Sequence, residues 1–171
     1  AMEPETKYCQ AILQAWYPGQ SGGKAAAEVL FGDYNPAGRL PVTFYRNITQ
    51  LPDFEDYNMT GRTYRYFKGD PLFPFGYGLS YTTFNYGNIK LEQTIKVGET
   101  AKIIVPVTNT GNRDGEEVVQ VYLKKQEDAE GPVKTLRAFK RVQIPAGKTV
   151  NVELELTPKQ LEWWDAQTNT M

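Results

Sequence analysis

The sequence contains no histidine, and cysteine occurs only once, at Cys9. Without histidine there is no Ser-His-Asp or Cys-His catalysis, no usual catalytic zinc site and no common proton shuttle for neutral pH. A single cysteine excludes an internal disulfide and a Cys-x-x-Cys motif, and we expect Cys9 to be a small apolar side chain rather than a reactive thiol. Any chemistry within this chain would therefore depend on carboxylates, lysine, tyrosine, arginine and hydroxyl groups, and we expect neither a metal site nor a cofactor.

An excess of positive or negative charge is also lacking. The 171 residues carry a net charge of −1 without a basic run, which argues against nucleic acid as a partner. No apolar stretch approaches the length needed to span a bilayer, so no membrane partner is predicted, and no signal peptide is visible at the start. Hydrophobic residues make up 40% of the chain and aromatic residues 13%, a composition that is compatible with a packed core.

Residues 1–70 predict mixed structure. An apolar run from Tyr8 to Trp16 is compatible with strand or helix, and the Tyr17-Pro-Gly turn after it favours a strand. Residues 24–31 are alanine-rich and precede Gly32, which predicts a helix with a glycine at its C-terminal end. A short strand is expected at 39–44. The glycine-rich turn before the helix lacks the phosphate-binding signatures, so tight packing is the favoured interpretation. These elements are too few to enclose a core, so we expect part of this domain to lie upstream.

Two groups of side chains are candidates for sugar chemistry. Asp53, Glu55 and Asp56 lie in one proline-bearing loop, and although paired carboxylates carry out glycoside hydrolysis, such a loop is usually just solvated. Residues 61–67 alternate in side-chain type and predict a strand. The side chains of Arg62, Tyr64 and Arg65 in this segment are candidates for substrate binding, because aromatic faces stack on sugar rings and guanidinium groups bind hydroxyls. Packing within the domain is the favoured alternative.

Residues 71–84 form an aromatic connector with two prolines and two glycines. Proline fixes φ and glycine permits close backbone approach, so rings in this setting indicate a stiff connector between two domains rather than a floppy linker. We expect Phe73, Phe75 and Tyr77 to be mostly buried.

Residues 85–171 show strand periodicity throughout. Alternating apolar residues and Gly/Pro turns predict strands near 88–91, 100–107, 116–124, 136–144 and 148–156, with a helical turn at 157–165. This pattern predicts an immunoglobulin- or fibronectin-III-like β-sandwich. About five strands are fewer than a seven-strand sandwich needs, so its last strands are expected to be missing and one edge to be open. We predict homodimerisation or strand exchange through that edge.

Several long motifs resemble one family. They are Ala11–Gly23, Val29–Asp33, Asn35–Phe44, Pro71–Phe84 and Val107–Gly111. Together they are similar to the C-terminal part of glycoside hydrolase family 3, and Gly61–Tyr66 resembles its β-xylosidase-like branch. The resemblance implies that residues 1–70 end an α/β sandwich domain and that residues 85–171 form a fibronectin type III-like domain. The expected fold class is therefore mixed and mainly β.

The resemblance also implies a function. Family members remove β-linked sugars such as xylose or glucose from non-reducing ends with retention, and their catalytic residues lie upstream of the segment matched here. The chain is therefore expected to be a non-catalytic fragment that stabilises the catalytic domains of its parent, in a secreted or periplasmic protein. The alternative is a carbohydrate-binding or protein-interaction module, motivated by Tyr64, Tyr66, Trp163 and Trp164, with a β-linked oligosaccharide as its partner.

Overall fold

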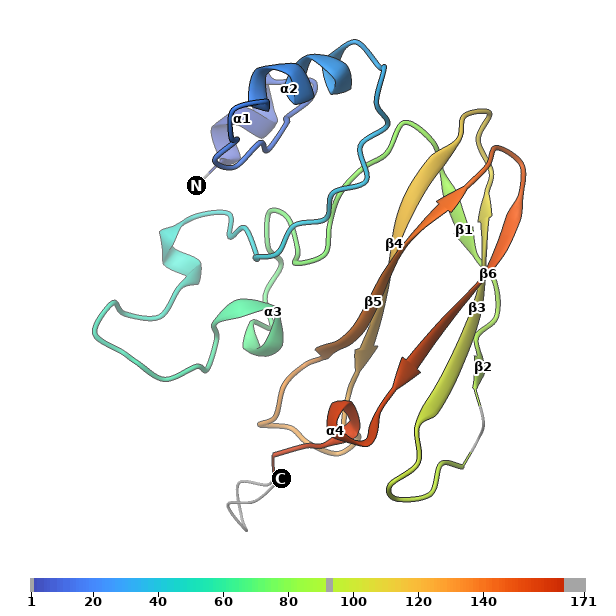
Figure 1. Cartoon of the computed structure of the whole chain (residues 1–171). Coiled ribbons are helices and arrows are strands. Elements are labelled where there is room, and N and C mark those ends of the chain that lie inside the picture. Colours follow the sequence, from blue (N-terminus) through green and yellow to red (C-terminus); the bar gives the residue numbers. More distant parts are fainter. Residues whose placement is uncertain (1, 92–93, 165–171) are drawn as a thin grey trace. The chain divides into compact units, whose positions relative to one another are not determined.

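A computed structural model describes residues 2–91 and 94–164 (Figure 1). The chain divides into two compact units. Unit 1 consists of Ala1–Ser80 with Lys124–Thr135, and unit 2 consists of Tyr81–Leu123 with Leu136–Met171. The chain therefore passes between the units three times, and a loop that interrupts the sequence of unit 2 belongs to unit 1. Asp165, the last residue of the predicted helical turn, lies outside the described residues.

Unit 1 contains short helices joined by long irregular segments. Its elements are α1 (Glu3–Tyr8), α2 (Gly22–Leu30), η1 (Ile48–Gln50) and α3 (Thr63–Tyr66). The predicted helix is confirmed as α2, in which Lys24 and Glu28 form an i,i+4 ion pair of 3.6 Å. The helix ends at Leu30, and Gly32, just after the C-cap Phe31, has a φ of 82°, a conformation that favours glycine.

Three strands predicted in residues 1–70 are wrong. The segment after α1 contains no strand as far as Trp16, and residues 39–44 contribute only a single bridge between Phe44 and Phe73. Residues 61–67 contain the helical turn α3, because Gly61 and Thr63 have φ values of 72° and 54°, which interrupt an extended chain. Alternating side chains form a strand only where a neighbouring strand supplies a ladder of backbone hydrogen bonds. Among the described residues, the connector supplies only isolated backbone bonds to residues 39–44.

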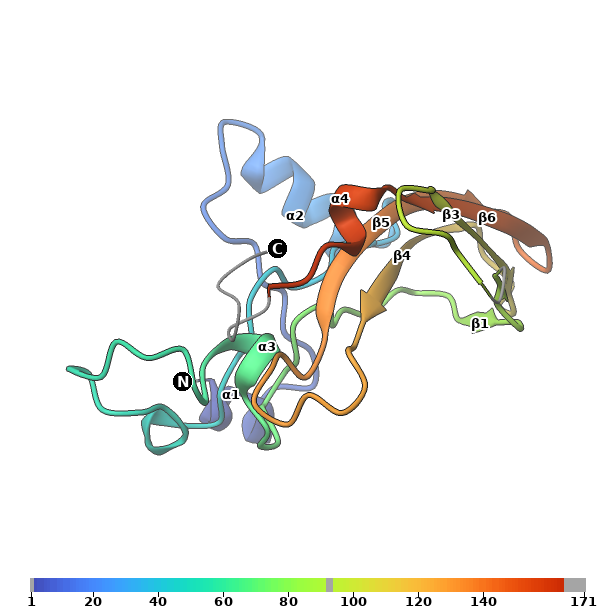
Figure 2. The same ribbon diagram turned by 90° about the horizontal axis from the view of Figure 1, so that it is seen from below.

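Unit 2 is built from two sheets. Its elements are β1 (Phe84–Tyr86), β2 (Lys90–Leu91), β3 (Ala101–Asn109), β4 (Gly115–Leu123), β5 (Thr135–Ile144), β6 (Thr149–Leu156) and α4 (Pro158–Leu161). In the first sheet β3 pairs with β6 on one edge and with the short β1 and β2 on the other, all antiparallel. The second sheet contains β4 and β5. Viewed from below, β3 and β6 form one layer beside β4 and β5 (Figure 2).

The predicted β-sandwich is confirmed. The core between the sheets contains Val105, Val107, Val119, Ile144, Val152 and Leu154, each 0–6% exposed. Ala101, Ile103 and Leu156 continue it toward α4. The five predicted strands are present, while β1 was not predicted because its three residues are too short for a periodic signal. The chain is thus mainly β, with short helices confined mostly to unit 1.

One buried polar residue ties the end of the sandwich together. Asn109 is 0% exposed, and its amide nitrogen donates to the carbonyls of Arg113 (2.8 Å) and Ile144 (2.9 Å). Its side-chain oxygen accepts from Thr82 Oγ1 (2.6 Å) and from the Gly111 amide (3.1 Å). Four hydrogen bonds thus satisfy the whole side-chain amide, as a buried polar group requires. This explains the Thr-Asn-Thr-Gly motif at residues 108–111.

The aromatic connector is held mainly by unit 1. The Phe44 amide donates to the carbonyl of Phe73 (2.9 Å), and the Gly76 amide donates to that of Leu40 (2.7 Å). The ring of Phe73 stacks on Tyr77 at 5.3 Å and meets Phe44 edge-on at 6.4 Å. The rings were expected to be mostly buried, and the structure covers them in part: Phe73 and Phe75 are half-buried and Tyr77 is 37% exposed. The connector rings contact one another and other rings of unit 1, and each keeps part of its surface exposed.

Candidate functional site

Arg62 organises the loop that contains the three candidate acids. Its Nε donates to the carbonyl of Asn58 (3.1 Å), and its Nη2 donates to the carbonyls of Asp53 (3.0 Å) and Asp56 (2.5 Å). A guanidinium has five donors in a planar fork, so one side chain can satisfy several carbonyls of a turning loop. Arg62 therefore acts first on the backbone of its own loop.

The acids of this loop make short-range turn contacts. Asp53 accepts from the amide of Glu55 (3.0 Å), and Asp56 accepts from the amide (2.9 Å) and side chain (2.7 Å) of Asn58. The hydrogen bond from the Asn58 amide lowers the pKa of the Asp56 carboxyl, with smaller contributions from the Asn58 side chain and the charge of Arg62. Asp56 is thus stabilised as an ion. A general acid for glycoside hydrolysis needs the opposite, a raised pKa.

Tyr64 and Arg65 project from the single helical turn α3. The ring of Tyr64 stacks on Phe75 of the connector, with 4.1 Å between centroids and 17° between planes. The Arg65 guanidinium lies 5.5 Å from the centroid of the Tyr66 ring, and its buried Nε has no hydrogen-bond partner within the described structure. The structure places Arg62, Tyr64 and Arg65 on one short segment, but Arg62 and Tyr64 are engaged in contacts within unit 1. Their assignment to substrate binding remains a prediction.

A further segment that supports α3 was not recognised from the sequence. The Val133 amide donates to the Arg65 carbonyl (2.6 Å), and Lys68 Nζ donates to the Ala129 carbonyl (3.0 Å). Both partners belong to residues 124–135, the loop between β4 and β5. Its only local signal is the cluster of Asp, Glu, Gly and Pro at residues 127–132, which predicts a turn but does not reveal its partner.

Among residues 2–91 and 94–164, no group of three or more acidic, cysteine or histidine side chains is placed to hold a metal ion. No helix in the same ranges is both long enough and apolar enough to cross a membrane. The two tryptophan candidates lie in unit 2. The ring of Trp163 is half-buried with the Arg137 guanidinium 5.3 Å from its centroid, and Trp164 is 51% exposed.

Comparison with known proteins identifies both parts of the chain. Residues 1–81 match the glycosyl hydrolase family 3 C-terminal domain, and residues 117–171 match the fibronectin type III-like domain. These matches define the class of the chain: a glycosyl hydrolase family 3 C-terminal domain followed by a fibronectin type III-like domain. The chain belongs to glycoside hydrolase family 3.

Relatives cover the chain almost completely. It is 59% identical over all of its 171 residues to a xylan 1,4-β-xylosidase of Xylanibacter ruminicola and 39% identical over 98% of its length to a periplasmic β-glucosidase of Salmonella typhimurium. A β-glucosidase structure from Erythrobacter marinus matches 94% of the chain at 43% identity with a TM-score of 0.79. The chain spans only 20%, 24% and 22% of these proteins, respectively.

Proposed function

We propose that this chain is the non-catalytic C-terminal part of a retaining glycoside hydrolase that removes β-linked xylose or glucose from non-reducing ends. Both domain matches and the relatives of known name support this proposal, and the short coverage of those relatives leaves room for the catalytic domains upstream. The lowered pKa of Asp56 also argues against Asp56 as a general acid. The 59% identity to a xylosidase makes xylose the first sugar to test.

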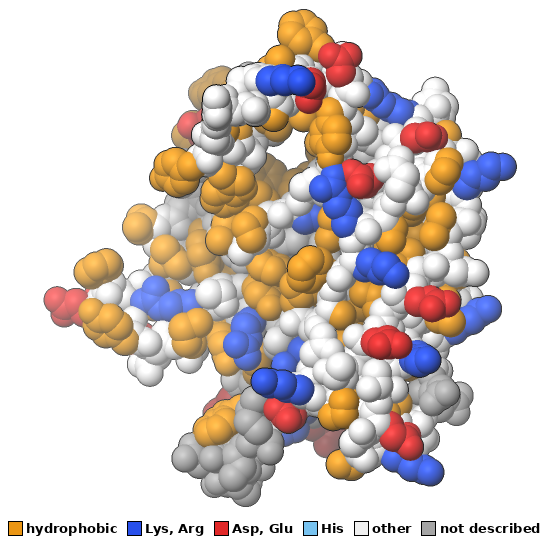
Figure 3. All heavy atoms as spheres, in the orientation of Figure 1, with side chains coloured by type: hydrophobic (Ala, Val, Ile, Leu, Met, Phe, Trp, Pro, Cys, Tyr) orange, Lys and Arg blue, Asp and Glu red, His pale blue; other side chains and the backbone are white. Residues whose placement is uncertain are grey.

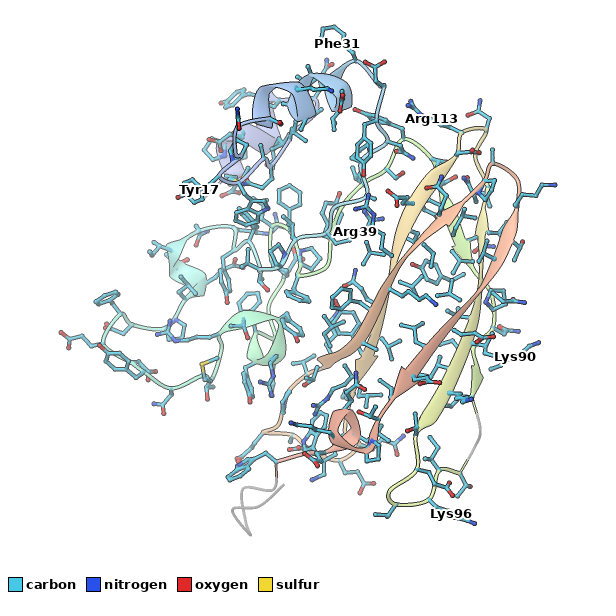
Figure 4. The ribbon with its side chains drawn as sticks, viewed as in Figure 1. Tyr17, Phe31, Arg39, Lys90, Lys96 and Arg113 are labelled. Carbon is cyan, nitrogen blue, oxygen red and sulfur yellow. The ribbon has the colours of Figure 1, made fainter. Side chains whose placement is uncertain are left out.

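The role of the segment in the parent is to stabilise the catalytic domains. The observation that carries this proposal is the exposed apolar surface of unit 1. Leu30 and Phe31 at the end of α2 are 69% and 84% exposed, and Tyr17 is 100% exposed (Figure 4). Exposed apolar area of this kind is typical of surfaces that another part of a protein covers. Covering these side chains stabilises by roughly 25 cal/mol per Å² of apolar area removed from water.

Two assays test this proposal. The isolated chain is expected to release no nitrophenol from nitrophenyl β-xyloside or β-glucoside, and detectable release that scales with protein concentration would contradict the non-catalytic role. In the parent enzyme, removal of the corresponding segment is expected to lower both the unfolding temperature and the activity. A truncated parent with unchanged melting and unchanged turnover would overturn the stabilising role.

A second candidate function is carbohydrate binding by the segment itself. The exposed ring of Trp164 and the half-buried ring of Trp163 favour it, because aromatic faces offer sugar rings a large contact area. Titration with xylo-oligosaccharides and cello-oligosaccharides tests it, and flat titrations with both would remove it. A periplasmic or secreted location fits either function, and its support is the name of one relative, a periplasmic β-glucosidase, rather than a feature of this chain.

Self-association is a separate proposal for the isolated chain. Among the described residues β4 pairs only with β5, which leaves the other edge of β4 open for a strand of a second copy. Light scattering over a range of concentrations is expected to show a dimer. A monomer at the highest concentration would count against association through this edge.

A further inference from the structure

One loop of unit 1 exposes two aromatic rings almost completely. The loop comprises residues 51–62, between η1 and α3. Phe54 is 93% exposed and Tyr57 is 91% exposed, and neither side chain has a hydrogen bond or ring contact within the described chain. Met59, two positions further along, is 48% exposed. Large aromatic side chains contribute most to binding when an interface covers them, so this loop is a candidate contact surface.

The backbone of this loop is held in one conformation by polar contacts. Arg62 donates to three of its backbone carbonyls, and the Asp56 amide donates to the Asp53 carbonyl (3.1 Å). Just after the loop, the Thr63 amide donates to the hydroxyl of Tyr45 (2.6 Å), which fixes the entry into α3. The exposed rings are therefore carried by an ordered segment. A segment that is ordered before it docks loses less conformational entropy on docking.

Carboxylates lie beside the two rings. Asp53, Glu55 and Asp56 bring three negative charges to this loop, against the single positive charge of Arg62. Asp53 and Asp56 accept from loop amides, whereas the exposed Glu55 carboxylate has no hydrogen bond or ion pair within the described chain. In the space-filling view, apolar and acidic side chains lie together at this loop, at the left of unit 1 (Figure 3). Such a surface complements an apolar recess that has basic side chains at its rim.

A partner within the same polypeptide is favoured over a second copy of this chain. The chain spans 20% and 24% of two of its relatives, so under the proposed function most of the parent lies outside it. Tethering gives such a partner an effective concentration of about the millimolar range. A symmetric contact between two copies through this loop would instead bring two sets of three carboxylates together, and like charges repel across an interface.

We propose that residues 53–59 dock into an apolar recess with a basic rim on the catalytic part of the parent protein. Phe54 and Tyr57 fill the recess, and the Glu55 carboxylate pairs with a basic side chain at the rim. The acids of this loop thus serve to hold domains together rather than to cleave a substrate. This inference rests on the proposed function, from which it takes the catalytic part.

Hydroxyl-radical footprinting of the intact chain and of the parent protein tests the docking. Mass spectrometry reads the oxidation of Phe54 and Tyr57 in both proteins. We expect both rings to react about tenfold more slowly in the parent, which corresponds to a docked state favoured by about 1.4 kcal/mol. In the parent unfolded by urea they should react as fast as in the unfolded chain. Equal rates in the folded parent and the folded chain would contradict the docking. Protection that appears in the concentrated chain alone would also overturn it, because a second copy would then be the partner.

Charge reversal at Glu55 tests the basic rim. In the parent, Glu55→Lys should return the oxidation rate of Tyr57 toward that of the isolated chain, and Glu55→Gln should have a smaller effect in the same direction. Glu99→Lys is the matched control, because it makes the same charge change at an exposed residue of unit 2 and should leave Tyr57 protected. Equal effects of Glu55→Lys and Glu99→Lys would contradict a basic rim.

Hydrolysis of nitrophenyl β-xyloside by the parent separates this inference from the proposed function. If the parent cleaves this substrate while Phe54 and Tyr57 react as fast as in the isolated chain, the docking fails and the proposed function stands. If both rings are protected in a parent that cleaves neither β-xyloside nor β-glucoside, the proposed function fails and the loop docks on a part that is not a glycosidase.

Discussion

The two units are stabilised in different ways. Unit 2 has a continuous apolar core in which Val107 and Ile144 are 0% exposed, and its central strand pairs on both edges. In unit 1, the described hydrophobic residue with the lowest exposure is Ala37, at 3%, and no larger apolar side chain of this unit is fully buried. The packing of unit 1 consists largely of aromatic pairs, edge-on or stacked, together with isolated backbone hydrogen bonds. A regular core is thus complete within unit 2, whereas unit 1 relies on rings that are only partly covered.

This difference explains why sequence patterns predicted one unit better than the other. In unit 2 each strand finds its partner within the chain, so period-2 alternation is realised as a sheet. In unit 1 the segments at 8–16, 39–44 and 61–67 have strand-like patterns but lack neighbouring strands among the described residues. Periodicity states which face a segment can bury, but not whether a surface is present to bury it against.

The largest expected effect is on the core of unit 2. Ile144→Ala should reduce the free energy of unfolding by about 2–5 kcal/mol, because it opens a cavity at a fully buried position. Ile89→Ala removes a side chain that is 66% exposed and should change stability by no more than about 0.5 kcal/mol. Denaturant unfolding measured by circular dichroism compares the two. Equal effects would mean that the core does not dominate the stability of unit 2.

The next effect concerns the buried amide at the end of the sandwich. Asn109→Ala should cost about 1–3 kcal/mol for each group that it leaves unsatisfied and buried, starting with the Ile144 carbonyl. Asn151→Ala on the exposed face of β6 is the control and should be nearly neutral. The same unfolding assay applies. If Asn109→Ala is as mild as Asn151→Ala, water replaces the amide and the four hydrogen bonds do not stabilise the fold.

A smaller and more local effect is expected for the aromatic connector. Phe73→Ala removes ring contacts with Phe44 and Tyr77, each worth about 0.5–1.5 kcal/mol. Amide exchange should accelerate at Phe44 and Leu72, whose amides donate across this contact, while exchange in β3 and β6 stays slow. Phe54→Ala, at a ring that is 93% exposed, should change neither region. Faster exchange in β3 after Phe73→Ala would show that the two units do not respond separately.

The smallest effect is the pH response of the acidic loop. The pKa of Asp56 is lower in the folded chain than its ordinary value. Its turn contacts therefore stabilise the loop at pH values above that ordinary pKa. That contribution is lost as the pH falls through the lowered pKa. The Asn58 amide should therefore exchange faster only in strongly acidic solution, whereas Asp56→Asn should weaken its protection at neutral pH as well. A midpoint above the ordinary aspartate value would contradict the direction of the shift.

Sequence reasoning predicted the sandwich and the helix α2, because each depends on local periodicity. It missed the contact between residues 124–135 and α3, since backbone hydrogen bonds such as Val133 to Arg65 leave no pattern in side-chain types. It also could not foresee that Arg62 would bind carbonyls of its own loop. Residue type indicates what a side chain can contact, whereas the partner is set by backbone geometry that only the fold supplies.

Residue-resolved hydrogen exchange of the intact chain tests the central comparison most directly. Amides of β3 and β6 should exchange most slowly, because opening them requires loss of the buried core, while amides of α2 and α3 should exchange orders of magnitude faster. This result would show that the core of unit 2 is the most stable part of the chain and that unit 1 opens independently of it. Equal protection of α2 and β3 would contradict the account.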